Sequence, residues 1–130
     1  MTVSLGRVLV VDDEPSVALV LRDALADLGY EVRIAGSGRE ALAAAGDFQP
    51  ATVLLDLKLP DLPGESVIDA LRREAPAVPI VVVSGNSDAE RARGLLQIGA
   101  FDYLAKPFQL SVLERVVAAA ILEHERRTSS

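Results

Sequence analysis

The sequence has 130 residues, of which 50% are hydrophobic and 25% are charged, so one domain with a proper apolar core is expected. The net charge of −6 argues against a nucleic-acid-binding surface, and the lack of cysteine excludes disulfides and thiolate metal sites. No stretch approaches the roughly 20 apolar residues that span a bilayer, and residues 1–7 lack a signal-peptide pattern. We therefore expect a cytoplasmic protein that does not bind membranes.

Short apolar runs, rich in β-branched residues, recur along the chain. The five runs are residues 7–11, 31–35, 51–55, 79–83 and 102–105. Runs this short and this apolar are typical of strands buried on both faces of a parallel sheet. The second and fifth runs are the most polar, so we place them at the sheet edges.

Segments with helical character alternate with these strands. The apolar stripes of the first, third and last helices are Val17, Leu21, Leu25 and Leu28; Val67, Ile68 and Leu71; and Leu110, Leu113, Val117, Ala120 and Ile121. Pro15 suits the first turn of the first helix, and Gly29 stands where that helix should stop.

The second and fourth helices are predicted from their start signals. Ser37 and Glu40 form a plausible capping box for a short helix over residues 38–45. Asp88 can cap a helix over residues 87–98. The whole pattern is five β-α units, which predicts an α/β fold with a parallel sheet and helices on both faces.

Polar groups follow four of the five predicted strands. Asp12, Asp13 and Glu14 follow the first strand, Asp56 the third, Ser84 and Gly85 the fourth, and Lys106 and Pro107 the fifth. The carboxyl ends of parallel strands meet at one edge of the sheet, where α/β proteins bind their ligands. We therefore expect these groups to form one site.

Three aspartates in this set indicate a cation site. Two like charges about 4 Å apart repel by roughly 4 kcal/mol at a protein-surface dielectric, so Asp12, Asp13 and Asp56 should hold a cation or share protons. A set of oxygen ligands without His or Cys favours Mg²⁺. His124 lies far along the chain, and we interpret it as a solvated residue.

The chemistry that this site favours is phosphoryl transfer. A carboxylate beside Mg²⁺, such as Asp56, is able to form an acyl phosphate. Lys106 and the Ser84 hydroxyl would stabilise the phosphoryl oxygens, and Gly85 would let the backbone come close. Each residue alone has an ordinary reading as a cap, a turn residue or a strand end, and their joint position on one edge favours function.

At this point the motifs resemble the receiver domain of bacterial response regulators, over about residues 5–125. The matching segments are VLVVDDEP at 8–15, LDLKLP at 55–60 with Gly64, VSG at 83–85, and GAFDYLAKPF at 99–108. The resemblance implies a flavodoxin-like, doubly wound sheet of five parallel strands in the order 2-1-3-4-5, with five helices.

The resemblance also implies a role for each matched residue. Asp56 would be the phosphoacceptor, and Asp13, Asp56 and the backbone carbonyl of Lys58 would bind Mg²⁺ directly, with Asp12 acting through water. Ser84, Lys106 and the Gly85 backbone would bind the phosphoryl group. Ser84 and Tyr103 would form the conformational switch, and the Lys106–Pro107 bond would be cis. Lys58 and Asn86 stand at positions that influence the lifetime of the acyl phosphate.

The partners expected from the resemblance are a sensor histidine kinase or a phosphotransfer protein. The domain would catalyse its own phosphorylation and dephosphorylation rather than act as a conventional enzyme. The fourth helix, fifth strand and last helix resemble the face used for an output partner or a homodimer, with no direct nucleic acid binding. Residues 126–130 would be a tail or the start of a linker to an output domain.

Three other classes compete with this interpretation. A phosphatase of the haloacid dehalogenase type would need a second Asp two residues after the nucleophile, where Lys58 stands. A nucleotide- or flavin-binding module would need a glycine-rich loop after the first strand, which is acidic here. A purely structural pseudo-receiver would not need the intact set of Asp12, Asp13, Asp56, Ser84 and Lys106.

Overall fold

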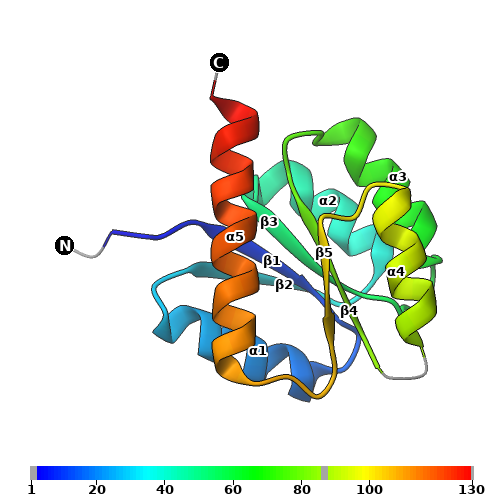
Figure 1. Ribbon diagram of the computed structural model, residues 1–130, viewed down its shortest axis with the longest axis horizontal. Helices are drawn as coiled ribbons and strands as arrows, with labels where there is room; N and C mark the ends of the chain where they lie inside the picture. The colour runs from blue at the N-terminus through cyan, green and yellow to red at the C-terminus, as the bar shows by residue number, and fades with distance from the viewer. Residues whose placement is uncertain (1–2, 86–87, 130) are drawn as a thin grey trace.

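The computed structural model describes residues 3–85 and 88–129, which form five alternating strands and helices (Figure 1). The elements are β1 Arg7–Val11, α1 Pro15–Asp27, β2 Glu31–Ala35, α2 Gly38–Phe48, β3 Thr52–Asp56, α3 Gly64–Glu74, β4 Ile80–Ser84, α4 Ala89–Gln97, β5 Asp102–Ala105 and α5 Leu110–Thr128. No helix in the described ranges is long and apolar enough to cross a membrane.

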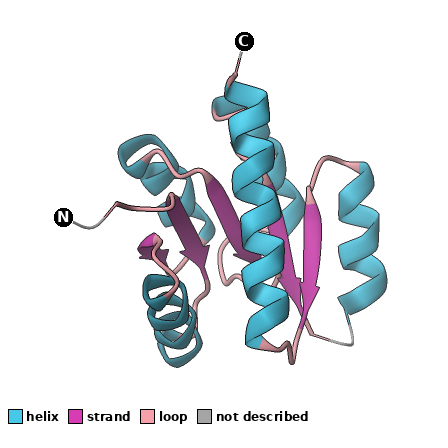
Figure 2. Ribbon diagram, turned by 60° about the vertical axis from the view of Figure 1, so that its left-hand side comes forward, coloured by secondary structure: helices cyan, strands magenta, loops and turns pink. Residues whose placement is uncertain are grey.

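The strands form one parallel sheet in the order β2-β1-β3-β4-β5, which confirms the predicted fold class and the two edge strands. Helices α1 and α5 cover one face, and α2, α3 and α4 cover the other, so the sheet is enclosed on both sides (Figure 2). Two of the predicted strands are shifted by one residue: β3 begins at Thr52 and β4 at Ile80.

Several helix ends differ from the prediction. Helix α2 continues past residue 45 to Phe48 and ends where Gln49 adopts a left-handed backbone with φ of 52°. Helix α4 begins at Ala89, Ser87 lies outside the described residues, and the Asp88 side chain makes no capping bond to the described helix. The starts of α1 and α2 are as predicted: Pro15 stands in the first turn of α1, and Ser37 Oγ accepts from Glu40 N at 3.1 Å.

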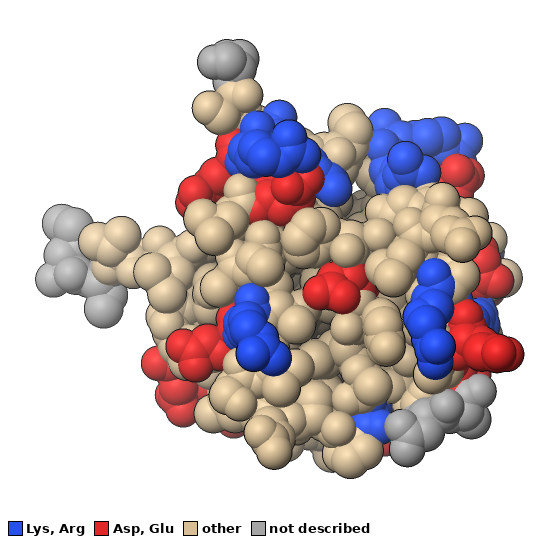
Figure 3. Space-filling model, in the orientation of Figure 1, with Lys and Arg blue, Asp and Glu red and all other residues tan. Residues whose placement is uncertain are grey.

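Helix α5 extends further than expected, through Thr128, although its apolar stripe ends at Ile121. The extension carries charged side chains at its C-terminal end (Figure 3). Glu123 accepts from Arg126 at 2.6 Å and from Arg127 at 2.7 Å, which are pairs at the i,i+3 and i,i+4 spacings that lie on one helix face. These pairs support a helix that no longer packs through apolar residues.

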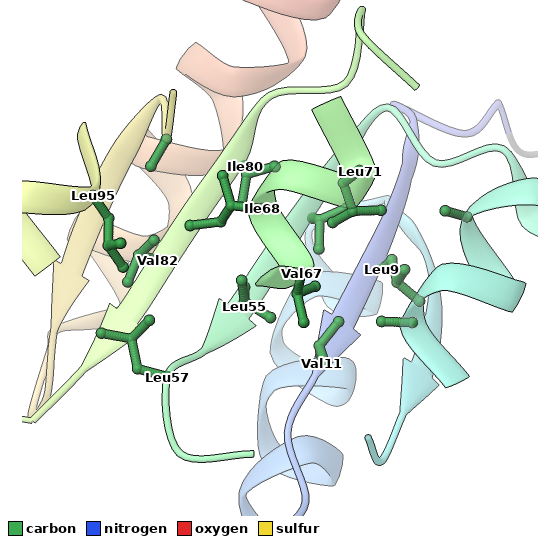
Figure 4. Packing of buried hydrophobic residues seen from close by; sticks show 14 of the residues in the cluster. Leu9, Val11, Leu55, Leu57, Val67, Ile68, Leu71, Ile80, Val82 and Leu95 are labelled. Carbon is green, nitrogen blue, oxygen red and sulfur yellow. The ribbon is translucent and has the colours of Figure 1, made fainter. Parts of the chain in front are cut away.

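The apolar core lies in two layers because alternate residues of each strand point to opposite faces of the sheet. Leu9, Val11 and Leu55 contribute to the layer under α2, α3 and α4 (Figure 4). Val8, Val10 and Leu54 contribute to the layer under α1 and α5. Burial of each such side chain stabilises the fold by about 1.5–3 kcal/mol, and the two layers fix the ends of the strands in space.

Candidate functional site

Polar groups at the ends of β1, β3, β4 and β5 come together at the carboxyl edge of the sheet; they belong to Asp12, Asp56, Ser84 and Lys106. Asp56 ends β3 opposite Val83 of β4, and Ser84 ends β4 opposite Ala105 of β5. Asp12 follows β1, and its amide donates to Ala35 O of β2 at 3.0 Å, which continues the ladder by one residue. The parallel register therefore brings side chains from distant parts of the sequence to one place.

An acidic cluster forms the centre of the site. Asp12, Asp13 and Asp56 each offer a carboxylate oxygen, and these oxygens lie within 4.8 Å of one another. Asp12 and Asp56 are buried, whereas Asp13 is exposed. Local bonds hold two of the carboxylates: Asp12 Oδ1 accepts from Glu14 N, and Asp56 Oδ1 accepts from Lys58 N, both at 2.9 Å.

Lys106 supplies the positive charge of the site. Its Nζ lies 3.1 Å from Asp56 Oδ2 and 3.8 Å from Asp12 Oδ2. The Lys106 amide donates to Ser84 O at 2.7 Å, and the Lys106–Pro107 bond is cis, as the resemblance implies. The contact with Asp12 is one that sequence reasoning missed, because only a shared sheet edge linked the two residues.

Burial raises the pKa of Asp12 above its ordinary value, and the negative charge of Asp56 acts in the same direction. The bond from the Glu14 amide and the charge of Lys106 oppose this rise. Three carboxylates gather here, and Lys106 is the cation that contacts them among the described residues, so one positive charge faces three acidic groups. A hard cation fits such a set of oxygen ligands, and the residues present fit Mg²⁺.

Ser84 brings a hydroxyl group to this edge of the sheet. Its side chain is buried, and among the described residues no atom makes a hydrogen bond to its Oγ. A buried hydroxyl left unpaired costs about 1–3 kcal/mol, which points to a ligand as its missing partner. Beside it, a Cβ placed on Gly85 would meet no described atom within 4 Å, so the space next to the backbone is open.

The remaining predicted residues surround this centre. Lys58 is exposed, and its backbone meets Asp56 through the bond given above. Tyr103 is half-buried on β5 opposite Val82, three residues before Lys106. Asn86 lies outside the described residues. His124 lines a hollow with Arg7, which begins β1, so it lies at the opposite end of the strands from the acidic cluster.

Comparison with known proteins adds a family to this geometry. The model of the response regulator receiver domain matches residues 8–118. The chain is 35% identical over 118 residues to the regulatory protein AtoC of Escherichia coli, and this alignment covers 91% of this chain and 26% of AtoC. It is 42% identical over 115 residues to the transcriptional regulatory protein PrrA of Mycobacterium tuberculosis, and this alignment covers 88% of this chain and 49% of PrrA.

Solved structures agree with this match. The response regulator receiver domain protein from Clostridium thermocellum has a TM-score of 0.89 and 27% sequence identity to this chain. The similarity covers 94% of this chain and 98% of that one. The chain spans half or less of the length of AtoC and PrrA.

Proposed function

Because the chain belongs to the family of response regulator receiver domains, we propose that Asp56 accepts a phosphoryl group from a phosphohistidine on a partner. Receiver domains of this family partner with histidine kinases, and the donor here would be such a kinase or a phosphotransfer protein. An Asp56 carboxylate oxygen would form the new O–P bond as the N–P bond of the donor breaks, and the electron pair would return to the imidazole, which then takes a proton.

The observation that carries this proposal is the meeting of a buried carboxylate with two kinds of phosphate-binding group. Asp56 lies within reach of the Lys106 ammonium. The neighbouring strand ends at Ser84, whose hydroxyl has no hydrogen-bond partner among the described residues. Preorganised cations and donors of this kind stabilise the oxygens of a phosphoryl group during transfer. We assign phosphoryl binding to Ser84, Lys106 and the backbone of Gly85.

We assign the cation, Mg²⁺, to Asp13, Asp56 and the Lys58 carbonyl, with Asp12 acting through water. The support is the cluster of three carboxylates, of which exposed Asp13 offers the side open to solvent. Bound Mg²⁺ would neutralise the carboxylates and the incoming phosphoryl oxygens. Lys106 and the local backbone bonds would hold Asp56 oriented towards the donor.

We propose that phosphorylation switches the surface around Tyr103. The added charge would draw the Ser84 hydroxyl towards the phosphoryl group, and Tyr103 on the adjacent strand would turn inward. A shift from about 1% to 99% active needs roughly 5.5 kcal/mol of differential stabilisation, which a few charge-assisted hydrogen bonds can supply. The face of α4, β5 and α5 would then bind an output partner or a second copy.

The proposed receiver unit spans residues 5–125, and residues 126–130 would be a tail or the start of a linker to an output domain. The regulatory protein AtoC and the transcriptional regulatory protein PrrA are both longer than this chain, which covers 26% and 49% of them. Nucleic acid binding would belong to such an added domain, not to the receiver unit. We propose a cytoplasmic location, because a kinase that supplies the phosphoryl group draws on ATP.

The direct test is incubation with acetyl phosphate and Mg²⁺, followed by intact mass measurement. The expected result is a gain of one phosphoryl group, which disappears in Asp56→Ala and when the metal is chelated. Asp47→Ala, which changes an exposed carboxylate on α2, serves as the matched control and should keep the adduct. An adduct that persists in Asp56→Ala would contradict the proposal.

A further inference from the structure

The loop that connects β3 to α3 caps a helix to which it is not connected in sequence. Asp61 Oδ1 accepts from Gly38 N at 2.8 Å, and Asp61 Oδ2 accepts from Arg39 N at 3.0 Å. These amides belong to the first turn of α2, whose N–H groups have no partner within the helix. Ser37 is the N-cap residue of α2, and its Oγ accepts from the next amide, Glu40 N.

These two bonds hold a loop that has little backbone support of its own. In the part of the chain that the structure describes, no backbone–backbone hydrogen bond outside the regular elements involves residues 58–62. Pro60 and Pro63 have no N–H to donate, which removes two of the bonds that a loop normally forms. The Asp61 carboxylate therefore provides the polar connection between the middle of this loop and a packed helix.

Close packing accompanies the capping. A Cβ on Gly38 would lie 2.9 Å from Leu62 Cδ1, so the loop and the start of α2 approach as closely as a glycine allows. Leu59 and Leu62 also pack against the buried cluster beneath α2 and α3. Loss of the Asp61 bonds would leave apolar contacts, which are not directional, to hold the loop.

The same loop reaches the acidic cluster at its other end. Lys58 N donates to Asp56 Oδ1, so the position of the Lys58 backbone and the orientation of the Asp56 carboxylate depend on each other. Only Leu59 and Pro60 separate Lys58 from Asp61, and the fixed φ of Pro60 stiffens this link. A carbonyl ligand must be held within a fraction of an ångström to be useful.

We propose that Asp61 is a positioning residue of the site, which fixes the Lys58 backbone through its capping of α2. This inference rests on the proposed function in so far as it assigns the Lys58 carbonyl to Mg²⁺. The backbone bonds from Gly38 and Arg39 lower the pKa of Asp61, with the Arg39 charge acting in the same direction, so the cap remains ionised at neutral pH.

The chain offers a matched control, because Ser37 and Asp61 cap the same turn and only Asp61 belongs to the loop. Asp61→Ala, Asp61→Asn and Ser37→Ala would be compared with wild type. Amide hydrogen exchange of Lys58, measured by NMR without metal, should be several-fold faster in Asp61→Ala and unchanged in Ser37→Ala. Calorimetric Mg²⁺ titration should show a dissociation constant about 10-fold higher in Asp61→Ala, with Asp61→Asn intermediate because it keeps one acceptor oxygen.

Two outcomes would overturn the positioning role. One is an Asp61→Ala chain with the Lys58 exchange rate and Mg²⁺ affinity of wild type. The other is a Ser37→Ala chain that matches Asp61→Ala, since both effects would then come from a weakened α2. A wild-type chain without Mg²⁺ affinity would contradict the proposed function, whereas the exchange rates, measured without metal, decide the anchoring of the loop separately. Asp61→Asn keeps the size of the side chain and serves if Asp61→Ala fails to fold.

Discussion

The Nζ of Lys106 lies 3.1 Å from Asp56 Oδ2, although Lys106 follows β5 and Asp56 ends β3, and β4 separates these two strands in the sheet. The lysine side chain therefore reaches across the end of β4, where Ser84 stands. In this position the ammonium group neutralises part of the acidic cluster. It also lies where it would repel a cation bound to the same carboxylate.

Lys106→Met should therefore bind Mg²⁺ more tightly than wild type. Removal of the ammonium removes a like charge near the cation and leaves the carboxylates without their protein counter-charge. We expect the Mg²⁺ dissociation constant to fall by about 3- to 10-fold, a difference of roughly 1 kcal/mol in a partly exposed site. Calorimetric titration at pH 7.5 measures this change.

The control for Lys106→Met is Arg73→Met, which makes the same change in net charge in the last turn of α3. It should leave the Mg²⁺ affinity within twofold of wild type, because salt screens the interaction of exposed charges that lie further apart than the Debye length, about 10 Å at 0.1 M ionic strength. Unchanged or weaker binding in Lys106→Met would contradict the proposed competition between Lys106 and the cation.

Asp13→Asn should remove most of the stabilisation that Mg²⁺ gives to the fold. A ligand that binds the folded state stabilises it by about 2.7 kcal/mol at 100 times its dissociation constant. Asp13 is exposed, so its substitution should change the metal-free stability little. Thermal unfolding with and without Mg²⁺ measures the difference, and exposed Asp47→Asn on α2 should keep the full Mg²⁺ effect. Equal Mg²⁺ stabilisation of Asp13→Asn and wild type would exclude Asp13 as a ligand.

The sheet was predictable because buried parallel strands are almost continuously apolar. Every residue of β3 and β4 is buried, and three of the five strands have the predicted bounds. The meeting of Asp56 and Ser84 at one sheet edge was predictable for the same reason, since they are polar residues at the ends of such strands. Local rules also predicted the Ser37 cap, which depends on residues close in sequence.

Three features escaped prediction, and one of them depends on a contact between distant parts of the chain. The cap that Asp61 makes joins residues 23 positions apart, and no pattern near Gly38 in the sequence predicts it. Asp88 has the residue type of a cap but not the bond, so residue type alone misled. The extension of α5 carries ion pairs of Glu123, which an apolar-stripe argument does not count.

Substitution by alanine should change the stability of the fold in opposite directions at Gly94, which lies within α4, and at Gly99, which follows that helix. Gly94 is a helical residue whose Cβ would meet no described atom within 4 Å, so Gly94→Ala should stabilise the fold by about 0.5–1 kcal/mol. Gly99 has a φ of +122°, and a Cβ placed on it would clash with the Arg72 side chain. Gly99→Ala should destabilise the fold by about 2 kcal/mol or more.

The cost at Gly99 has two parts, because Arg72 is flexible and is able to move. Its movement would break the bond from Arg72 Nη1 to Ile98 O, which is 2.7 Å long, and the unfavourable φ would remain. Urea unfolding of both variants measures the free energies. A Gly99→Ala chain as stable as Gly94→Ala would show that neither the backbone conformation nor the Arg72 contact matters to the fold.

The end of α5 should depend on pH through Glu123. Hydrogen bonds from Arg126 and Arg127 lower the pKa of Glu123 from 4.5 to about 2. A carboxylate with a lowered pKa in the folded helix stabilises that helix above pH 4.5, and this contribution is lost as the pH falls towards 2. We therefore expect the helicity of residues 126–128, read from NMR Cα shifts, to decrease over this range in wild type.

The comparison variant is Glu123→Gln, in which the ion pairs are absent at every pH. Its residues 126–128 should already show reduced helicity at pH 7 and should change less between pH 4.5 and 2. The change in helicity of the variant with pH is subtracted from that of wild type, which removes the effect of other carboxylates that titrate in the same range. Glu125→Gln alters an exposed neighbour and should follow wild type. If Glu123→Gln kept the wild-type helicity at pH 7, the continuation of α5 beyond its apolar stripe would need a cause other than these ion pairs.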